Sequence, residues 1–298
     1  MLPTKVQSTT EVSSHLKNSR AHTIVKRKTS LKLNLMNDYG LDIHTHLKKI
    51  ESDINLDEFL GKHNISKDYR AKMVDWIVEV LTTFKTSEQT FFLTINILDR
   101  YFKNSEKNLS SSDLHISGVV AMFIASKYED VIPILMRTVI NKIGHGKFEV
   151  PQIEDKELEV LKTIGFKIGA PTIKEFLDRY CEELADILPK TDRFKKICTF
   201  IARMTSHNYT LMQISTSLLA AGILNFGLQA SSKVDVKVDV DKIMEQVADF
   251  AHLNLEDVKE TTKQIVAFAK NFEKLHPNLK NLKTFYSEDF KVIKTMTG

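Results

Sequence analysis

Apolar residues recur at helical spacing along most of the chain from Asp38 onward. In residues 69–85, YRAKMVDWIVEVLTTFK, the side chains of Val74, Ile77 and Leu81 share one helical face. Most of the ten glycines and six prolines fall between such segments, as is usual at helix ends. The pattern predicts an all-α fold, with helices at about 38–51, 55–61, 67–85, 88–103, 113–129, 134–143, 152–164, 173–186, 191–206, 211–228, 241–252 and 255–275.

Two segments, LHISGVVAMFIASK from Leu114 and MQISTSLLAAGILN from Met212, are apolar on nearly every side and contain Gly, Ala and Ser. Such a helix is typical of the centre of a bundle, where its neighbours approach closely. The similarity of the two segments predicts two helical bundles of similar size, each around one central helix. Residues 231–242, SSKVDVKVDVDK, alternate like a strand, but we expect an irregular linker because a lone strand is unstable.

Several helix ends carry local signals. Thr86 with Gln89 and Thr172 with Glu175 have the spacing of a capping box. Residues 1–36 are rich in Ser, Thr, Lys and His without periodicity, which predicts a disordered tail. Within that tail the run VKRKTSLK is either a nuclear-import signal or a solvated basic cluster.

Composition narrows the class of protein. A hydrophobic share of 42% with 27% charged residues is typical of a soluble globular protein, and a formal net charge of +4 is too small to indicate nucleic-acid binding. No stretch has the length and apolarity of a membrane span or a secretory signal, so we expect an intracellular protein without a membrane partner. Cys181 and Cys198 each lie in a helical run and are expected to be buried free thiols in a reducing compartment.

Arg70 lies four residues before Val74, on the apolar face of its helix, and Asp99 lies on the apolar face of the next helix. Helices joined by a short turn run antiparallel, which brings the start of the first to the end of the second. An unpaired buried charge costs several kcal/mol, so we predict a structural ion pair between the two side chains. The alternative is an arginine that extends to the rim, with Asp99 at a frayed end.

Lys127 and Glu157 are also charged residues on apolar faces. Lys127 follows Phe123 and Ile124 at the end of the first central helix, and Glu157 shares a stripe with Leu161. Either the two charges pair with each other across the bundle, or they extend from an apolar surface to bind a partner protein. The residues themselves leave both alternatives open.

Trp76 lies on a different face of the 69–85 helix, next to Met73 and Glu79. This face is either the rim of the core or an exposed docking patch. Signatures of nucleotide, zinc and redox enzymes are missing, so we expect no enzyme activity, no cofactor and no metal site. His44 and His46 are two residues apart, which directs them to roughly opposite sides of a helix and argues against a metal site there.

Four motifs occur in the order that is found in the cyclin family. YRAKMVDWIVEV, FFLTINILDRYF, ISGVVAMFIASKYED and GFKIGAPTIKEFLDRY together resemble a cyclin box, and DYGLDIHTHLKKIE resembles the helix that precedes it in A- and B-type cyclins. The resemblance implies two tandem five-helix cyclin-box domains with a preceding N-terminal helix. The implied boundaries are 37–168 for the first domain with its preceding helix and 169–298 for the second.

The implied function is that of a regulatory cyclin, which binds and activates a cyclin-dependent serine/threonine protein kinase and controls the cell cycle. Such a partner favours the inward position of the kinase αC helix and supplies no catalytic residue itself. By position, the resemblance implies kinase contacts at Lys127, Glu157, Leu161, Phe166, Ile168, Tyr39, Ile43 and Ile124. It also matches Arg70 and Asp99 to an internal ion pair of the family.

The resemblance further implies a docking patch for kinase substrates or inhibitors that carry an Arg-x-Leu segment, formed by Met73, Trp76, Glu79, Leu114 and His115. Here the chain departs from the family pattern. Tyr69 replaces the usual Met, Lys72 replaces an apolar residue, and His115 replaces a glutamine. A lysine beside the groove repels a basic motif, so we expect weaker docking of the usual segment.

The alternative function is a cyclin-fold transcription or scaffold protein that contacts DNA or a basal factor and does not activate a kinase. We expect the protein in the nucleus and the cytoplasm, with no direct nucleic-acid contact. The tail segment KTSLKLNLMN resembles a destruction box only loosely, with Lys28 at the arginine position. Timed degradation, the particular kinase and its substrates do not follow from the sequence.

Overall fold

The computed structural model describes residues 39–54, 56–188, 192–232 and 239–297. The chain divides into two compact units, residues 1–45 and 46–298, and each is described by itself. In the first unit, residues 39–45 are helical, whereas the predicted tail, with its basic run and its destruction-box-like segment, lies outside the described residues. Residues 233–238, in the middle of the alternating segment, also lie outside them.

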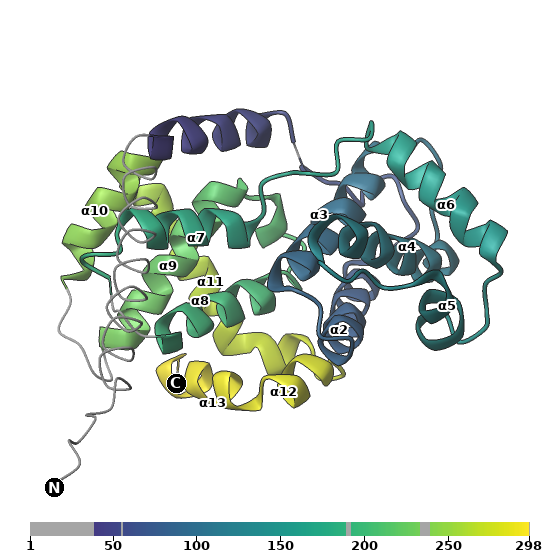
Figure 1. The fold of residues 1–298 in the computed structure, drawn as a ribbon. Coiled ribbons are helices and arrows are strands. Elements are labelled where there is room, and N and C mark those ends of the chain that lie inside the picture. Colours follow the sequence, from purple (N-terminus) through teal and green to yellow (C-terminus); the bar gives the residue numbers. More distant parts are fainter. Residues whose placement is uncertain (1–38, 55, 189–191, 233–238, 298) are drawn as a thin grey trace, which may run out of the picture. The chain divides into compact units, whose positions relative to one another are not determined.

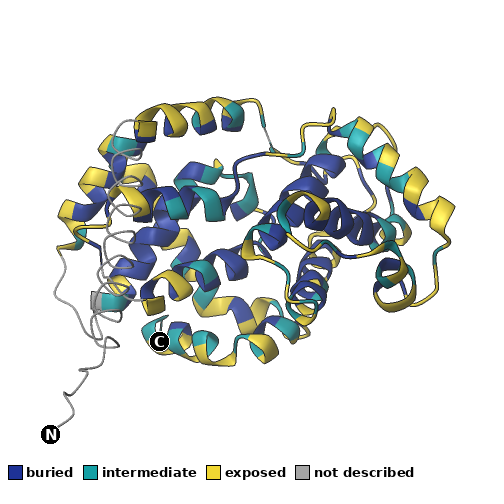
Figure 2. Ribbon diagram, viewed as in Figure 1, coloured by how far each residue is buried: buried dark blue, intermediate teal, exposed yellow. Residues whose placement is uncertain are grey.

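The second unit begins with helical residues 46–52 and then forms a first group of helices around α4 (Figure 1). Helix α4 packs against α2, α3, α6 and the π-helical turn η1. Most of its residues are buried, because neighbours cover it on every side (Figure 2). The elements of this group are α2 (Lys67–Thr83), α3 (Glu88–Asn104), α4 (Ser111–Glu129), α5 (Met136–Thr138), η1 (Val139–Ile143) and α6 (Val150–Thr163).

A second group of helices surrounds α9, which packs against α7, α8, α10 and α11. At Gly222 an added Cβ would lie 2.9 Å from Thr261 Cγ2 of α11, so the small residue permits this close approach. The elements are α7 (Ile173–Glu183), α8 (Asp192–Thr205), the 3-10 turn η2 (Leu211–Gln213), α9 (Thr216–Ser232), α10 (Val240–Ala251), α11 (Leu255–Leu275), α12 (Asn281–Phe285) and α13 (Ser287–Thr297).

Helix α2 makes several of the polar contacts between the two groups. Arg70 Nη1 donates to Ser206 O at 2.9 Å, just beyond the end of α8. The carboxylate of Asp75 accepts hydrogen bonds from the backbone N–H groups of residues 280–282 at 3.0–3.1 Å, at the start of α12. The helices around α9 therefore contact the helices around α4 through buried hydrogen bonds as well as through apolar packing.

The all-α prediction is confirmed for the described residues, and two helical groups around central helices are present as expected. The predicted helix at 55–61 is wrong, because residues 57–62 form turns. The predicted helix at 134–143 is the short α5 followed by a π-helical turn. Residues 211–215 of the predicted helix 211–228 precede α9 rather than belonging to it, and α12 and α13 were not predicted.

Capping explains two of the helix starts. Thr172 Oγ1 accepts from Glu175 N at 3.2 Å at the start of α7, which confirms that predicted cap. At the start of α3 the cap is Ser87, whose Oγ accepts from Thr90 N at 3.1 Å, so the prediction of Thr86 was wrong by one residue. No helix among the described residues has the length and apolarity that crossing a membrane requires.

Candidate functional site

The exposed edge between α4 and α6 carries a charged pair. Lys127 Nζ, at the end of α4, donates to Glu157 Oε1 of α6, and the same ammonium lies 4.1 Å from the centre of the Phe123 ring. The Lys127 side chain is 40% exposed, whereas Glu157 is mostly covered. Of the two alternatives from the sequence, the pairing across the bundle is therefore formed, and it still leaves the ammonium accessible to a partner.

The turn after α6 presents an aromatic side chain outward. Gly165 and Phe166 have φ of 63° and 57°, and Phe166 N donates to Leu161 O at 2.8 Å. Arg100 Nη2 supports the turn from α3 by donating to Lys167 O at 2.7 Å. A left-handed phenylalanine is costly, and here it leaves a large apolar side chain 60% exposed. The left-handed conformation ends α6, and it leaves the Phe166 ring accessible to another molecule.

Between this turn and the ends of α3 and α4 lies a groove with a volume of about 830 Å³. Its walls combine apolar side chains with the arginine and lysine of α3, as in a protein interface with an apolar centre. The lining includes Ile54, Leu56, Arg100, Tyr128, Phe166 and Ile168.

The remaining kinase-contact residues implied by the resemblance differ in accessibility. Tyr39 and Ile43, in the first unit, are 55% and 43% exposed. Leu161 is partly buried against the core. Ile124 is only 2% exposed, so its place is in the core of the first helical group and not at a surface.

An exposed apolar loop that was not predicted from the sequence lies directly after α4. Val131 and Ile132 are 100% and 87% exposed, and Tyr128 and Leu135 are exposed as well. The available signal was the apolar run VIPIL, which contains a proline and directly follows the charged end of a helix. Exposed apolar residues beside the charged pair extend the candidate binding surface.

Arg70 and Asp99 lie together in the core, both with no exposed side-chain surface. The guanidinium donates from Nε to Oδ1 at 2.7 Å and from Nη2 to Oδ2 at 2.6 Å, a bidentate pair. With its third bond to Ser206 O, Arg70 joins α2, α3 and the segment after α8. The pair is therefore internal and takes no part in the binding surface.

The residues of the expected docking patch also lie close together. The Trp76 and His115 rings are 5.1 Å apart, and the His115 and Phe148 rings are 5.1 Å apart. Met73 and Leu114 are buried beneath them, and an added Cβ on Gly118 would lie only 2.5 Å from Met73 Sδ. Glu79 is exposed, but its Oε2 accepts from Asn281 Nδ2 at 2.9 Å.

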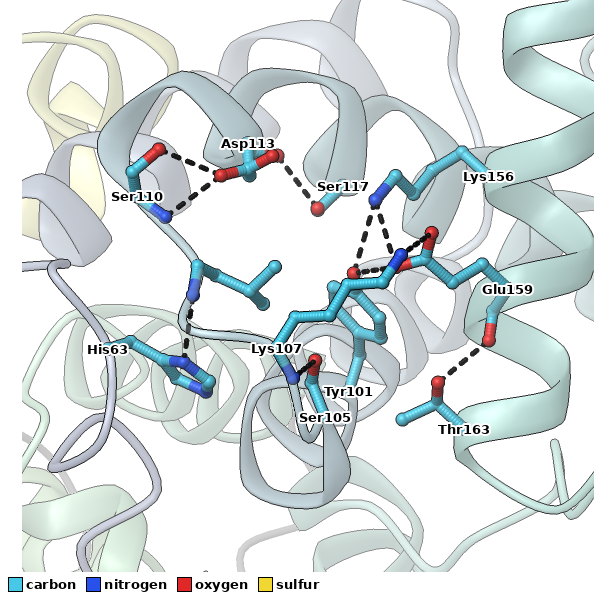
Figure 3. A network of polar contacts seen from close by, with 11 residues as sticks. His63, Tyr101, Ser105, Lys107, Ser110, Asp113, Ser117, Lys156, Glu159 and Thr163 are labelled. Atoms are coloured by element: carbon cyan, nitrogen blue, oxygen red, sulfur yellow. Dashed lines mark hydrogen bonds and ion pairs between the residues drawn. The ribbon is translucent and has the colours of Figure 1, made fainter.

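A polar network joins α3 and the segment that follows it to α6 (Figure 3). Tyr101 OH donates to Glu159 Oε1 at 2.6 Å, and Lys107 Nζ donates to Glu159 Oε2 at 2.9 Å. Burial alone would raise the pKa of Glu159, but hydrogen bonds from Tyr101, Lys107 and Lys156 lower it to about 2. The network positions α6, and with it Glu157, against the bundle.

Metal binding and thiol chemistry are the two further kinds of site considered for the described residues. No group of three or more His, Cys, Asp or Glu side chains there is arranged to hold a metal ion. Cys181 and Cys198 are buried free thiols, and burial raises the pKa of both.

Comparison with known proteins gives two family matches, "Cyclin, N-terminal domain" over residues 42–169 and "Cyclin, C-terminal domain" over residues 171–297. A viral cyclin from herpesvirus saimiri has the same fold, with a TM-score of 0.61 and 17% identity over 75% of this chain and 97% of that one.

Among curated relatives, G2/mitotic-specific cyclin-B1 of Oryzias latipes is 26% identical over 72% of this chain and 52% of its own length. G2/mitotic-specific cyclin C13-1 of Daucus carota is 30% identical over 62% of this chain and 55% of its own length. Cyclin-A3-2 of Arabidopsis thaliana is 28% identical over 61% of this chain and 50% of its own length. The chain thus spans about half the length of these relatives. Because the two family models together match most of the chain in tandem, this protein belongs to the cyclin family.

Proposed function

We propose that this chain binds a cyclin-dependent serine/threonine protein kinase and activates it, and that it controls the cell cycle in this way. The observation that carries the proposal is the groove of about 830 Å³ that Phe166 and Tyr128 help to line. Lys127, which pairs with Glu157, directly precedes Tyr128 at the end of α4. An apolar groove with a few charged residues at its rim suits a partner helix. The names of the relatives support a role in mitotic control.

The proposed mechanism is a shift of population in the kinase. A kinase of this class needs its αC helix turned inward, so that a lysine–glutamate pair can position the ATP phosphates. A rigid surface that binds the inward helix better than the outward helix favours the active state by the difference in affinity. This chain contributes contacts and no catalytic group, and it acts in the nucleus and the cytoplasm, where its kinase and substrates meet.

The test mixes the purified full chain with a purified cyclin-dependent kinase that lacks a cyclin. We expect a complex on size-exclusion chromatography and a large increase in phosphotransfer to a short peptide substrate. The matched control is a chain with Phe166→Asp, which places a charge in the groove without touching the core. No complex and no stimulation with any kinase of this class would refute the proposal. Binding of random duplex DNA by the chain alone would instead favour the alternative of a transcription protein.

A further inference from the structure

Arg100 of α3 is one of four arginines that are buried in the described part of the chain, and it is 5% exposed. The other three each form an ion pair with a carboxylate, Arg70 with Asp99, Arg179 with Glu182 and Arg203 with Glu88. Burial lowers the pKa of Arg100, and no carboxylate of the described residues offsets that effect. A buried charge without a counter-ion is costly, so Arg100 differs from the other three in a way that its own chain does not explain.

The hydrogen bonds of Arg100 within the described part of the chain both go to uncharged groups. Nη2 donates to Lys167 O at 2.7 Å, and Nη1 donates to Asn96 Oδ1 at 3.4 Å, which is a long bond. A guanidinium carries more N–H groups than these two bonds use, so Arg100 can still donate to another molecule. A neutral donor could also reach Lys167 O, and that bond therefore explains the position of the side chain but not its charge.

Arg100 lines the groove of about 830 Å³, whose other walls are mostly apolar or uncharged. The charged residues of the lining are Arg100, Lys103, Lys167 and Asp53. Lys103 Nζ donates to Asp57 O, whereas Lys167 and Asp53 are exposed to solvent. The groove therefore has an excess of positive charge, and its most deeply buried charged residue is the arginine that lacks a counter-ion.

We propose that Arg100 binds a carboxylate of the partner helix that occupies this groove, on an Asp or Glu side chain with apolar neighbours. The inference rests on the proposed function, in which that helix is the αC helix of the kinase. A guanidinium and a carboxylate form two parallel hydrogen bonds, and the apolar neighbours pack on Phe166 and Ile168. The acidic residue differs from the αC glutamate that pairs with the kinase lysine, because that glutamate serves the ATP site.

The test is a double-mutant cycle between the full chain and the kinase, with affinities measured by calorimetric titration. Arg100→Gln removes the charge, and each Asp or Glu on the exposed face of the kinase αC helix is replaced in turn by Asn or Gln. We expect Arg100→Gln to weaken kinase binding about tenfold or more, and one of the kinase substitutions to have a similar effect. The two together should weaken binding little further than either alone, because both remove the same ion pair.

Two further variants serve as controls. Arg193→Gln on α8 makes the same substitution at an exposed arginine outside the groove and should leave the affinity unchanged. Arg100→Lys keeps a positive charge and should still bind the native kinase more tightly than the neutral kinase variant. If Arg100→Gln does not fold, the kinase substitutions against the native chain still decide, because one of them must weaken binding about tenfold.

Unchanged kinase affinity in Arg100→Gln would overturn the proposal. Weaker affinity without coupling to any acidic residue of the αC helix would overturn it as well, and would show that Arg100 only supports the turn at Lys167. Both results leave the proposed function intact, because the native chain still forms the complex.

A native chain that binds no kinase would refute the proposed function instead. The groove is then probed with two amphipathic helical peptides that differ only by Glu or Gln at the centre of the apolar face. Tighter binding of the Glu peptide, lost in Arg100→Gln and kept in Arg193→Gln, would support the carboxylate site. Equal binding of the two peptides, or binding of neither, would overturn it.

Discussion

Arg70 has no exposed surface, and its guanidinium makes three hydrogen bonds, two to Asp99 and one to Ser206 O. Removing only one member of a buried pair leaves an uncompensated charge. We therefore expect Arg70→Met to lower the free energy of unfolding by about 3–5 kcal/mol, as measured by urea denaturation.

The double variant Arg70→Met, Asp99→Leu is the matched comparison. Because it removes both buried charges, it should regain a large part of the lost stability, although Ser206 O still lacks its donor. A double variant as unstable as the single one would show that packing, and not the unpaired carboxylate, causes the loss.

Lys127 and Glu157 belong to the proposed kinase-binding surface and are paired in the free chain. When a partner covers them, each charge loses water, so truncation of either should weaken kinase binding by about 2 kcal/mol. We expect this for Lys127→Ala and for Glu157→Ala, measured by calorimetric titration with the kinase. Lys259→Ala, which breaks an exposed pair with Glu256 on α11, should leave the affinity unchanged. Unchanged affinity in both site variants would place the interface elsewhere.

At the scale of elements, Asp75 of α2 holds the start of α12. Burial alone would raise the pKa of Asp75, but His207 and the backbone N–H groups of Leu282 and Asn281 offset this, so the pKa is lowered. His207 Nε2 is 3.6 Å from Oδ1, so the backbone hydrogen bonds are the closer contacts. A short helix such as α12 gains its order from this anchor rather than from its own length.

The carboxylate should therefore stabilise the fold in a pH-dependent manner. Because its pKa is lower in the folded state, the contribution is complete above the unfolded pKa of about 3.9 and is lost as the pH falls through the folded value. At pH 7 we expect Asp75→Asn to cost about 2 kcal/mol in urea denaturation. The difference between the variant and the native chain should shrink below about pH 4. A difference that stays constant down to pH 3 would contradict this role.

At the scale of the whole molecule, the two helical groups of the second unit share buried contacts. Leu282 has no exposed surface, and its backbone N–H binds Asp75 of the other group. We expect the two groups to unfold together, so that the emission of Trp76 and the far-ultraviolet circular dichroism change at the same urea concentration.

Leu282→Ala tests that coupling. It should lower stability by about 3 kcal/mol and shift both signals by the same amount, although the substitution lies far from Trp76 in sequence. Lys280→Ala keeps the backbone contacts and should have little effect. A shift in circular dichroism that leaves the Trp76 transition in place would show that the groups unfold independently.

The sequence by itself determined the long helices, because their apolar stripes and caps are local properties that do not depend on distant contacts. It also indicated that Arg70 and Asp99 are partners, since the antiparallel arrangement of neighbouring helices follows from a short turn. It did not reveal α12 or α13. Helix α12 has only five residues and depends on an anchor that lies more than two hundred residues earlier in the chain.

Only the tertiary structure decided which charged residues remain accessible. Lys127 and Glu157 could have paired or faced solvent, and the choice depended on how closely α4 and α6 approach. Ile124 shares its helix with Lys127 but turns into the core, a difference that family position did not reveal. The hydrogen bond from Asn281 to Glu79 joins residues about two hundred positions apart, so no local sequence pattern predicts it. Side-chain accessibility is set by packing between elements, and for that reason the sequence alone did not determine which residues form the binding surfaces.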